Sequence, residues 1–257
     1  SERDTGTHYT CRCSGEGRMP ISEIRDILKQ ETVEKTVLEE IMADERKGVR
    51  QLVDAYIRRL NRESAERFRV EDMYEPESSF YKKGLEYVAG IDEVGRGPLA
   101  GPVTVAAVIL KPHIFIAGLN ESKKMAPQRR KEIAKKIHDT AVDISLVSVS
   151  PDEIDMRNIY AATTEAMFRA VRNLKIQPQA VIVDAMPLHF PVPSLSLVHG
   201  DAKSASVAAA SIVAKVHRDH LMDEYDKVYP GYGFSQNKGY GSAEHIVAFR
   251  TLGITRI

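Results

Sequence analysis

An apolar, strand-forming run ends at two adjacent acids, Asp92 and Glu93, and two glycines that flank an arginine follow at once. Residues 87–92 are too apolar for an exposed edge, so they predict a central strand with an acid at its end. A carboxylate buried without a partner costs several kcal/mol, and a second acid beside it adds repulsion between like charges. A divalent cation such as magnesium or manganese would relieve both costs. This stretch alone is equally compatible with a solvated Asp-Glu turn.

Two later segments also deliver an acid after an apolar strand. Residues 180–184 form a β-branched run that ends in Asp184, and a short strand that begins at Leu195 precedes Asp201. Open α/β sheets place their sites at the carboxyl ends of the strands. We therefore expect these acids to meet Asp92 at one edge of the sheet.

A long helix is predicted directly after Asp201. Ser204 or Ser206 is its expected N-cap, and the small residues 208–211 should let its backbone approach the sheet closely. Because Asp201 precedes this N-terminus, we expect the positive end of the helix dipole to favour the ionised form of its side chain.

The chain is expected to have three parts. Residues 1–18 are polar and rich in Ser, Thr and Gly, which predicts a disordered leader. Helical periodicity over 19–74 predicts a helical extension, and residues 75–257 are expected to form the catalytic domain, after a polar linker at 75–79. This leader contains three possible soft metal ligands, whereas a structural zinc site has four. We therefore favour free thiols on a tail over a zinc site. These ligands are His8, Cys11 and Cys13.

Within 75–257 the pattern alternates strands and helices, beginning with a hairpin. We predict a mixed five-stranded sheet flanked by helices. The expected strands are 86–92, 103–110, 144–149, 180–184 and a short one near 195–198; the expected helices are 127–139, one from 150, 159–174, 204–225 and 243–252.

Composition narrows the class of function. The 36 basic and 36 acidic residues balance, which argues against a surface that is positive throughout, although a basic patch stays possible. Both cysteines lie in the first segment, so no disulfide framework holds the core and a reducing compartment fits. No apolar run reaches the roughly 18 residues of a membrane helix, and the N-terminus lacks a signal pattern. We expect a cytoplasmic protein without a membrane anchor.

The helical extension carries many basic side chains. They could contact a polyanion, but a solvated, salt-paired helix face is the favoured interpretation. These residues are Arg46, Lys47, Arg50, Arg58, Arg59, Arg62 and Arg67.

Four acids at strand ends, with no nearby cysteine nucleophile or Ser-His pair, favour two hard metal ions over covalent catalysis. Two such ions suit an in-line displacement at phosphorus, so the expected substrate is a phosphodiester.

Several separate motifs, in order along 86–253, resemble bacterial ribonuclease HII, a type 2 ribonuclease H. The resemblance implies a ribonuclease H-like fold, and it implies that Asp92, Glu93, Asp184 and Asp201 together hold two Mg²⁺ or Mn²⁺ ions. Asp219 is the alternative for the fourth acid, unless it forms a helix-surface salt bridge. The matching motifs are residues 90–97, 118–124, 183–184, 200–204 and 209–219.

The resemblance also implies how the substrate is recognised. The family's Gly-Arg-Gly turn corresponds to Gly95, Arg96 and Gly97, whose backbone would reach a ribose 2′-OH, the group that distinguishes RNA from DNA. The tyrosine of its Lys-Gly-Tyr loop corresponds to Tyr240, which would stack on the following sugar. In a further loop Ser122 and Lys123 would contact backbone phosphate, unless they form an ordinary polar turn.

The implied reaction is hydrolysis of the RNA strand of an RNA/DNA hybrid, or incision 5′ to a ribonucleotide embedded in duplex DNA. It leaves a 3′-OH and a 5′-phosphate, and the chain is expected to act as a monomer. The pattern departs from the family at Glu121, where aspartate is more usual. It also lacks a His-Arg-rich segment after Ile257, which we expect to reduce affinity more than chemistry. Its N-terminal helices are longer than in the minimal family member and do not resemble the β-rich extension of ribonuclease HIII.

Two alternatives stay open at this point. Another nuclease or strand transferase of the same superfamily would share the acids but lack the Gly-Arg-Gly turn and the Lys-Gly-Tyr loop. A non-enzymatic hybrid-binding module would tolerate Asp92→Asn and Asp184→Asn.

Overall fold

The computed structural model describes residues 18–257. The predicted leader, with the thiols at Cys11 and Cys13, lies outside the described residues except for Arg18. Contacts divide the chain into two compact units after Ser64, and this division falls within one long helix, α3 (Lys47–Asp72). The predicted boundary lies ten residues further on, after residue 74.

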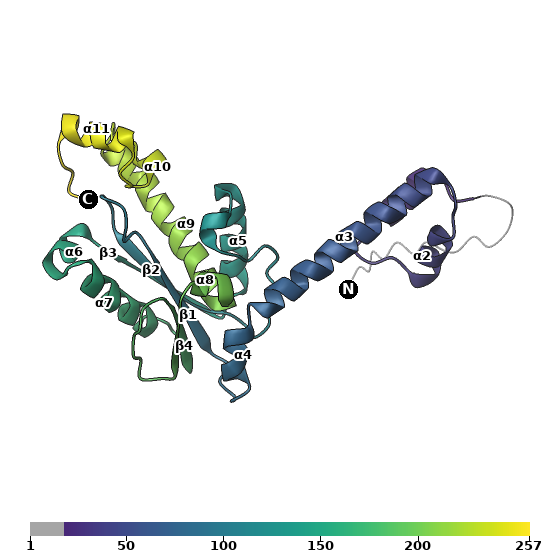
Figure 1. Cartoon of the computed structure of the whole chain (residues 1–257), viewed down its shortest axis with the longest axis horizontal. Helices are drawn as coiled ribbons and strands as arrows, with labels where there is room; N and C mark the ends of the chain where they lie inside the picture. The colour runs from purple at the N-terminus through teal and green to yellow at the C-terminus, as the bar shows by residue number, and fades with distance from the viewer. Residues whose placement is uncertain (1–17) are drawn as a thin grey trace, which may run out of the picture. The chain divides into compact units, whose positions relative to one another are not determined.

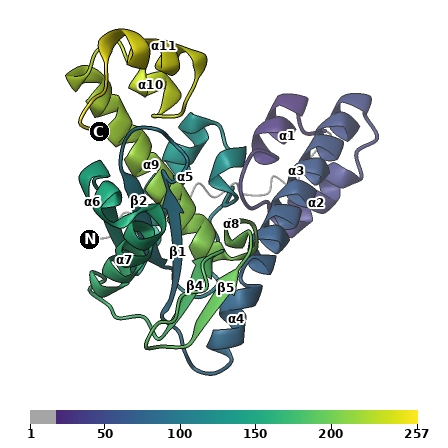
Figure 2. The ribbon, with the colours of Figure 1, turned by 60° about the vertical axis from the view of Figure 1, so that its left-hand side comes forward.

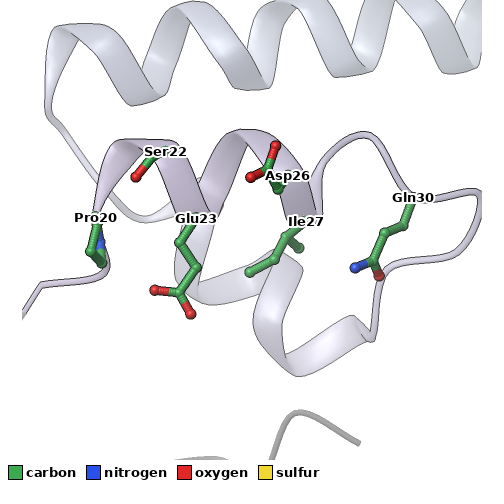
Figure 3. Close-up of a pocket in the computed structure, with 6 residues that line it drawn as sticks. All are labelled: Pro20, Ser22, Glu23, Asp26, Ile27 and Gln30. Atoms are coloured by element: carbon green, nitrogen blue, oxygen red, sulfur yellow. The ribbon is translucent and has the colours of Figure 1, made fainter. Parts of the chain in front are cut away.

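The N-terminal unit is helical, as predicted. It contains α1 (Ile21–Ile27), α2 (Lys35–Met42) and the first part of α3. Arg59 donates to the backbone oxygen of Leu28 at 2.9 Å, so this predicted basic residue is used within the unit. Residues of α1 and its flanks, from Pro20 to Gln30, line an open hollow (Figure 3), and none of the four predicted catalytic acids is among them. The apolar core of this unit comprises Ile24, Leu28, Ile41, Val49 and Tyr56.

The second unit is built on a mixed five-stranded sheet (Figure 1). The strand order is β3-β2-β1-β4-β5, with β1 in the centre as predicted; β1–β2 and β2–β3 pair antiparallel, and β1–β4 and β4–β5 pair parallel. The initial hairpin is therefore confirmed. The strands are β1 (Val88–Val94), β2 (Val103–Ile109), β3 (Asp143–Val149), β4 (Ala180–Asp184) and β5 (Ser194–Leu197).

Helices cover both faces of this sheet (Figures 1 and 2). On one face α9 (Ala205–Val228) and α5 (Pro127–Thr140) bury alanines and branched side chains against β2. On the other face α7 (Ile159–Arg172) packs on β1 and β2, with α6 (Pro151–Arg157) beside it. The two cores use alternate residues of the strands, because successive side chains point to opposite faces. The predicted fold class is confirmed.

Serine side chains cap the beginnings of several helices in this unit. Ser204 rather than Ser206 caps α9, since its oxygen accepts from the backbone nitrogen of Val207 at 3.2 Å. Ser242 caps α11 (Ala243–Leu252) in the same way. The unit also contains the 3₁₀ turn η1 (Ser122–Lys124) and the short helices α8 (Gly200–Lys203) and α10 (Phe234–Asn237). No helix among residues 18–257 combines the length and apolarity needed to cross a membrane.

The predicted linker at 75–79 is wrong. These residues belong to α4 (Glu75–Tyr81), in which Pro76 lies in the first turn, where proline is tolerated. Glu77 and Phe80 are buried although most of their neighbours in sequence are polar. A polar, proline-bearing segment resembles a linker, but here contacts distant in the sequence hold it as a helix.

Candidate active site

Strands β1 and β4 bring the first and third predicted acids to one edge of the sheet. The two strands are parallel neighbours, with Ile91 opposite Val183, so Asp92 and Asp184 are the next residues along each strand. Asp92 is only 6% exposed. The predicted shared edge is confirmed for these two acids, and β1 extends to Val94, so Asp92 and Glu93 lie within the strand rather than after it.

The fourth acid is linked to this edge through the backbone. Asp201 lies in α8, and the backbone nitrogen of the preceding residue, Gly200, donates to Asp184 Oδ1 at 2.7 Å. This close approach leaves little room for a side chain at Gly200, where a Cβ would lie 3.2 Å from Asp184 Oδ1. The glycine thus lets α8 approach the end of β4.

The predicted effect of the helix dipole on Asp201 is wrong for this structure. Burial raises the pKa of Asp201, and the negative charges of Asp184 and Glu121 raise it further. Asp201 belongs to the separate short helix α8 rather than preceding α9 directly. Repulsion and desolvation therefore outweigh any contribution of the dipole.

The site accumulates negative charge that the protein compensates only in part. Burial raises the pKa of Asp92 well above its ordinary value, and the charges of Glu93 and Asp184 add to the shift. Burial likewise raises the pKa of Glu93, although Arg96 Nη1 lies 3.2 Å from Glu93 Oε1 and opposes it. The other oxygen, Glu93 Oε2, is buried without a hydrogen-bond partner.

These observations fit a bound cation. An unsatisfied buried carboxylate oxygen among repelling acids is stabilised by a positive ion, and donors that are all oxygen suit Mg²⁺ or Mn²⁺. Within the described part of the chain, however, no three His, Cys, Asp or Glu side chains form a group that could hold a metal ion. The acids are thus brought to one region without being gathered into a closed cage.

Asp219, the alternative fourth acid, is engaged elsewhere. Its Oδ1 accepts from Lys215 at 2.7 Å, and its Oδ2 pairs with Arg130 at 3.3 Å. Both oxygens therefore have cationic partners, as the salt-bridge interpretation expected.

The loop with Ser122 and Lys123 is connected to the acidic edge by serine hydroxyls. Ser122 is buried, and its Oγ lies 2.9 Å from Ser211 Oγ on α9. Ser211 in turn hydrogen bonds to Asp92, which moderates the rise in the pKa of that acid. Lys123 is exposed. The Ser122 hydroxyl is thus committed to the interior, whereas the Lys123 side chain is accessible to a phosphate.

The Gly-Arg-Gly turn and the tyrosine loop lie against each other. A Cβ at Gly97 would be 3.7 Å from Tyr240 Cε1, so the tyrosine ring covers this glycine. Tyr240 as a whole is 45% exposed, while its backbone oxygen lies 2.8 Å from His245 Nδ1. Gly95 has φ of 103°, which other residues rarely adopt. The structure therefore brings together two motifs that are more than 140 residues apart.

Sequence reasoning missed the buried polar residues that support these elements. Glu77 Oε1 accepts from Ser204 Oγ at 2.6 Å, from Ser206 Oγ at 2.6 Å and from the Ser206 backbone nitrogen at 2.9 Å. Arg218, on the same helix α9, is fully buried. The run of small residues at 208–211 signalled close packing of α9, but no local signal identified Glu77 or Arg218.

Comparison with known proteins identifies the family. A model of ribonuclease HII matches residues 89–256, and a model of the ribonuclease HII N-terminal domain matches residues 20–81. The chain belongs to the ribonuclease HII family. Ribonuclease HII of Ligilactobacillus salivarius is 47% identical over 241 residues, which cover 93% of this chain and 94% of that protein. Ribonuclease HII of Listeria monocytogenes is 44% identical over 238 residues, covering 92% and 91%.

Solved structures agree with this assignment. Ribonuclease H2 of Pyrococcus horikoshii superposes with a TM-score of 0.57 at 27% identity, covering 65% of this chain and 89% of that one. A ribonuclease HII of Archaeoglobus fulgidus, solved in complex with PCNA, gives a TM-score of 0.56 at 25% identity, covering 66% of this chain and 92% of that one.

Members of the ribonuclease HII family are hydrolases that cleave RNA in RNA/DNA hybrids. The chain is therefore an enzyme, and the alternative of a non-enzymatic binding module is wrong.

Proposed function

We propose that this member of the ribonuclease HII family also incises duplex DNA 5′ to single embedded ribonucleotides, leaving a 3′-OH and a 5′-phosphate. The observation that carries the proposal is the closeness of Gly97 to the exposed Tyr240, beside the strand that bears Asp92 and Glu93. A glycine backbone can approach a ribose closely enough to hydrogen bond with its 2′-OH. An aromatic ring beside it offers a stacking surface for the next nucleotide. Two adjacent contacts of this kind suit a ribose-to-deoxyribose junction.

In this proposal Asp92, Glu93, Asp184 and Asp201 hold two Mg²⁺ or Mn²⁺ ions. The buried Glu93 Oε2, which has no hydrogen-bond partner, and the raised pKa of Asp92 support a cation at this position. When bound, the ions would activate the attacking water and stabilise the charge on the leaving oxygen.

Each remaining residue has a distinct role in the proposal. The backbone of Gly95, Arg96 and Gly97 recognises the ribose 2′-OH, and Tyr240 stacks on the following sugar. The exposed Lys123 contacts a backbone phosphate, with Ser122 keeping its loop against α9. Hydrolysis adds the water oxygen to phosphorus and breaks the bond to the 3′ oxygen, which leaves with a proton.

The remaining assignments concern the cellular setting. We assign catalysis to the predicted domain 75–257, acting as a monomer on a hybrid or on a DNA duplex with an embedded ribonucleotide. A cytoplasmic location is supported by the placement of both cysteines in the first segment, which needs no oxidising compartment.

The test is cleavage of a DNA duplex that contains one ribonucleotide, with and without Mg²⁺. The wild type should cut only with the metal, and Asp184→Asn or Asp201→Asn should lower kcat/KM by at least about a hundredfold without loss of fold. Asp219→Asn is the matched control, because Asp219 pairs with Arg130 and Lys215, and it should retain activity within about tenfold. Undiminished cleavage by Asp184→Asn would contradict the metal assignment.

A further inference from the structure

Arg218 is a cationic side chain in the interior of the second unit. Its exposure is 0%, and it is among the largest side chains that the fold buries completely. Burial lowers the pKa of its guanidinium. Isolated buried charges are costly, so such a group persists only where its donors are satisfied. Arg218 is therefore expected to have a specific structural task.

Three hydrogen bonds join the Arg218 guanidinium to backbone carbonyls. Nε donates to Pro102 O at 2.9 Å and Nη2 to Ala100 O at 3.1 Å, both in the loop between β1 and β2. Nη1 donates to Lys238 O at 2.8 Å, in the loop that follows α10. A planar guanidinium presents its donors in a fixed fork, so one rigid group holds two separate loops.

The two loops are also bonded directly to each other around this side chain. The backbone nitrogens of Leu99 and Ala100 both donate to Gly239 O, at 2.8 and 3.2 Å. A Cβ at Gly239 would lie 2.1 Å from Ala100 O, and one at Gly95 would lie 2.5 Å from Arg218 Nε. No larger residue fits at either position, so the glycines permit the approach and Arg218 fixes it.

The same two loops carry the proposed recognition groups. Residues 95–97 begin the loop between β1 and β2. Tyr240 lies two residues after Lys238, whose backbone oxygen accepts from Arg218. We propose that Arg218 is a positioning residue that sets the spacing between the Gly-Arg-Gly turn and Tyr240, and thereby the preference for a ribose-to-deoxyribose junction. The inference rests on the proposed function for the preference, but the tie between the loops is independent of it.

The test compares two variants. Arg218→Met keeps an extended side chain but removes every hydrogen-bond donor. Arg218→Lys keeps the positive charge but replaces the planar guanidinium with a compact ammonium group. Hydrogen exchange of the full chain without substrate reports on the tie. The amides of Leu99 and Ala100 should lose protection by about tenfold or more in Arg218→Met, and by less in Arg218→Lys. Unchanged exchange at both amides would overturn the proposal.

Kinetics then tests the consequence for substrate choice. The ratio of kcat/KM for one embedded ribonucleotide to kcat/KM for a continuous hybrid should fall by about tenfold or more in Arg218→Met. Arg218→Lys should recover part of this ratio. If Arg218 only stabilised the fold, its replacement would lower kcat/KM for both substrates by the same factor. That result would overturn the positioning role.

Arg130→Met is the matched control. Arg130 is also a buried arginine, but it donates to the carbonyls of Ser122 and Met125, in a different loop. This variant should leave the amides of Leu99 and Ala100 protected.

If Arg218→Met loses cooperative unfolding, Arg218→Lys carries both measurements, and wild-type values in it would overturn the proposal. Failure of the proposed function would look different. The wild type itself would then not cut the embedded ribonucleotide, whereas the exchange experiment would still decide whether Arg218 ties the loops.

Discussion

Individual residues of the candidate site are placed at a cost to stability. Asp92 is buried beside Glu93 and near the charge of Asp184, and its pKa is raised by all three influences. The folded protein thus retains a proton that the unfolded chain would release at moderate pH. Stability without metal should therefore fall as the pH rises from the ordinary aspartate range through the raised pKa. Sites assembled for binding commonly sacrifice stability in this way.

Asp92→Asn should stabilise the metal-free protein while abolishing cleavage. The neutral amide removes a buried charge, so the gain should be on the order of 1 kcal/mol at neutral pH and should vanish toward about pH 4. Calorimetry in a chelator across this pH range measures it. Asp219→Asn is the control: it breaks pairs with Lys215 and Arg130 and should destabilise the protein. A loss of stability in Asp92→Asn at neutral pH would contradict the account.

Tyr240→Ala should impair cleavage at a single ribonucleotide more than cleavage of a continuous hybrid. Removing the ring removes the stacking surface beside Gly97, and such stacking changes affinity by about tenfold or more. Steady-state kinetics on the two substrates measures the difference. Tyr240→Phe keeps the ring and should behave nearly as wild type, whereas equal losses on both substrates in Tyr240→Ala would argue against junction recognition.

At the level of elements, helix α9 connects every part of the candidate site. Its first turn is bonded to Glu77 of α4, and its second turn places Ser211 beside Asp92 and Ser122. Further along the helix, Arg218 reaches the two recognition loops. These contacts can form together only if the axis of α9 lies at a fixed distance, or height, above the sheet.

Gly90→Ala should strongly destabilise the protein, because Gly90 sets that height. A Cβ there would lie 2.1 Å from Ser206 C and 2.3 Å from Val207 N, which are backbone atoms that cannot rotate away. We expect a loss of about 3 kcal/mol or more, measured by denaturant unfolding. Gly48→Ala is the control, since its Cβ would meet the flexible side chain of Ile21, at 3.2 Å from Cδ1 and 4.0 Å from Cγ2. Its effect should stay within about 1 kcal/mol; equal effects of the two changes would refute the packing argument.

For the molecule as a whole, the sequence predicted what depends on local pattern. The five strands, the hairpin and the cap at Ser204, one of its two candidates, follow from periodicity and short-range hydrogen bonding, and all were confirmed. Asp92 and Asp184 were predictable as neighbours because each follows an apolar strand-forming run, and these two strands are adjacent and parallel in the sheet.

Features that depend on distant contacts were not predictable. Glu77 lies in a segment of linker-like composition. It is nevertheless buried, and its carboxylate accepts hydrogen bonds from Ser204 and Ser206, which lie 127 and 129 residues further along the chain. Arg218 lies in a polar stretch of α9 and is buried only because two loops fold over it. The ionisation of Asp201 was misjudged because its charged neighbours come from other elements.

The central claim is tested most directly by mapping the cut in a DNA duplex that carries one ribonucleotide and a label at the 5′ end of that strand. With Mg²⁺, the wild type should give one labelled product that ends in a 3′-OH immediately 5′ to the ribonucleotide. An identical duplex with deoxyribose at that position should stay intact. Cleavage at another position, cleavage of the all-DNA duplex, or no cleavage of a sample that does cut a continuous hybrid would contradict the account.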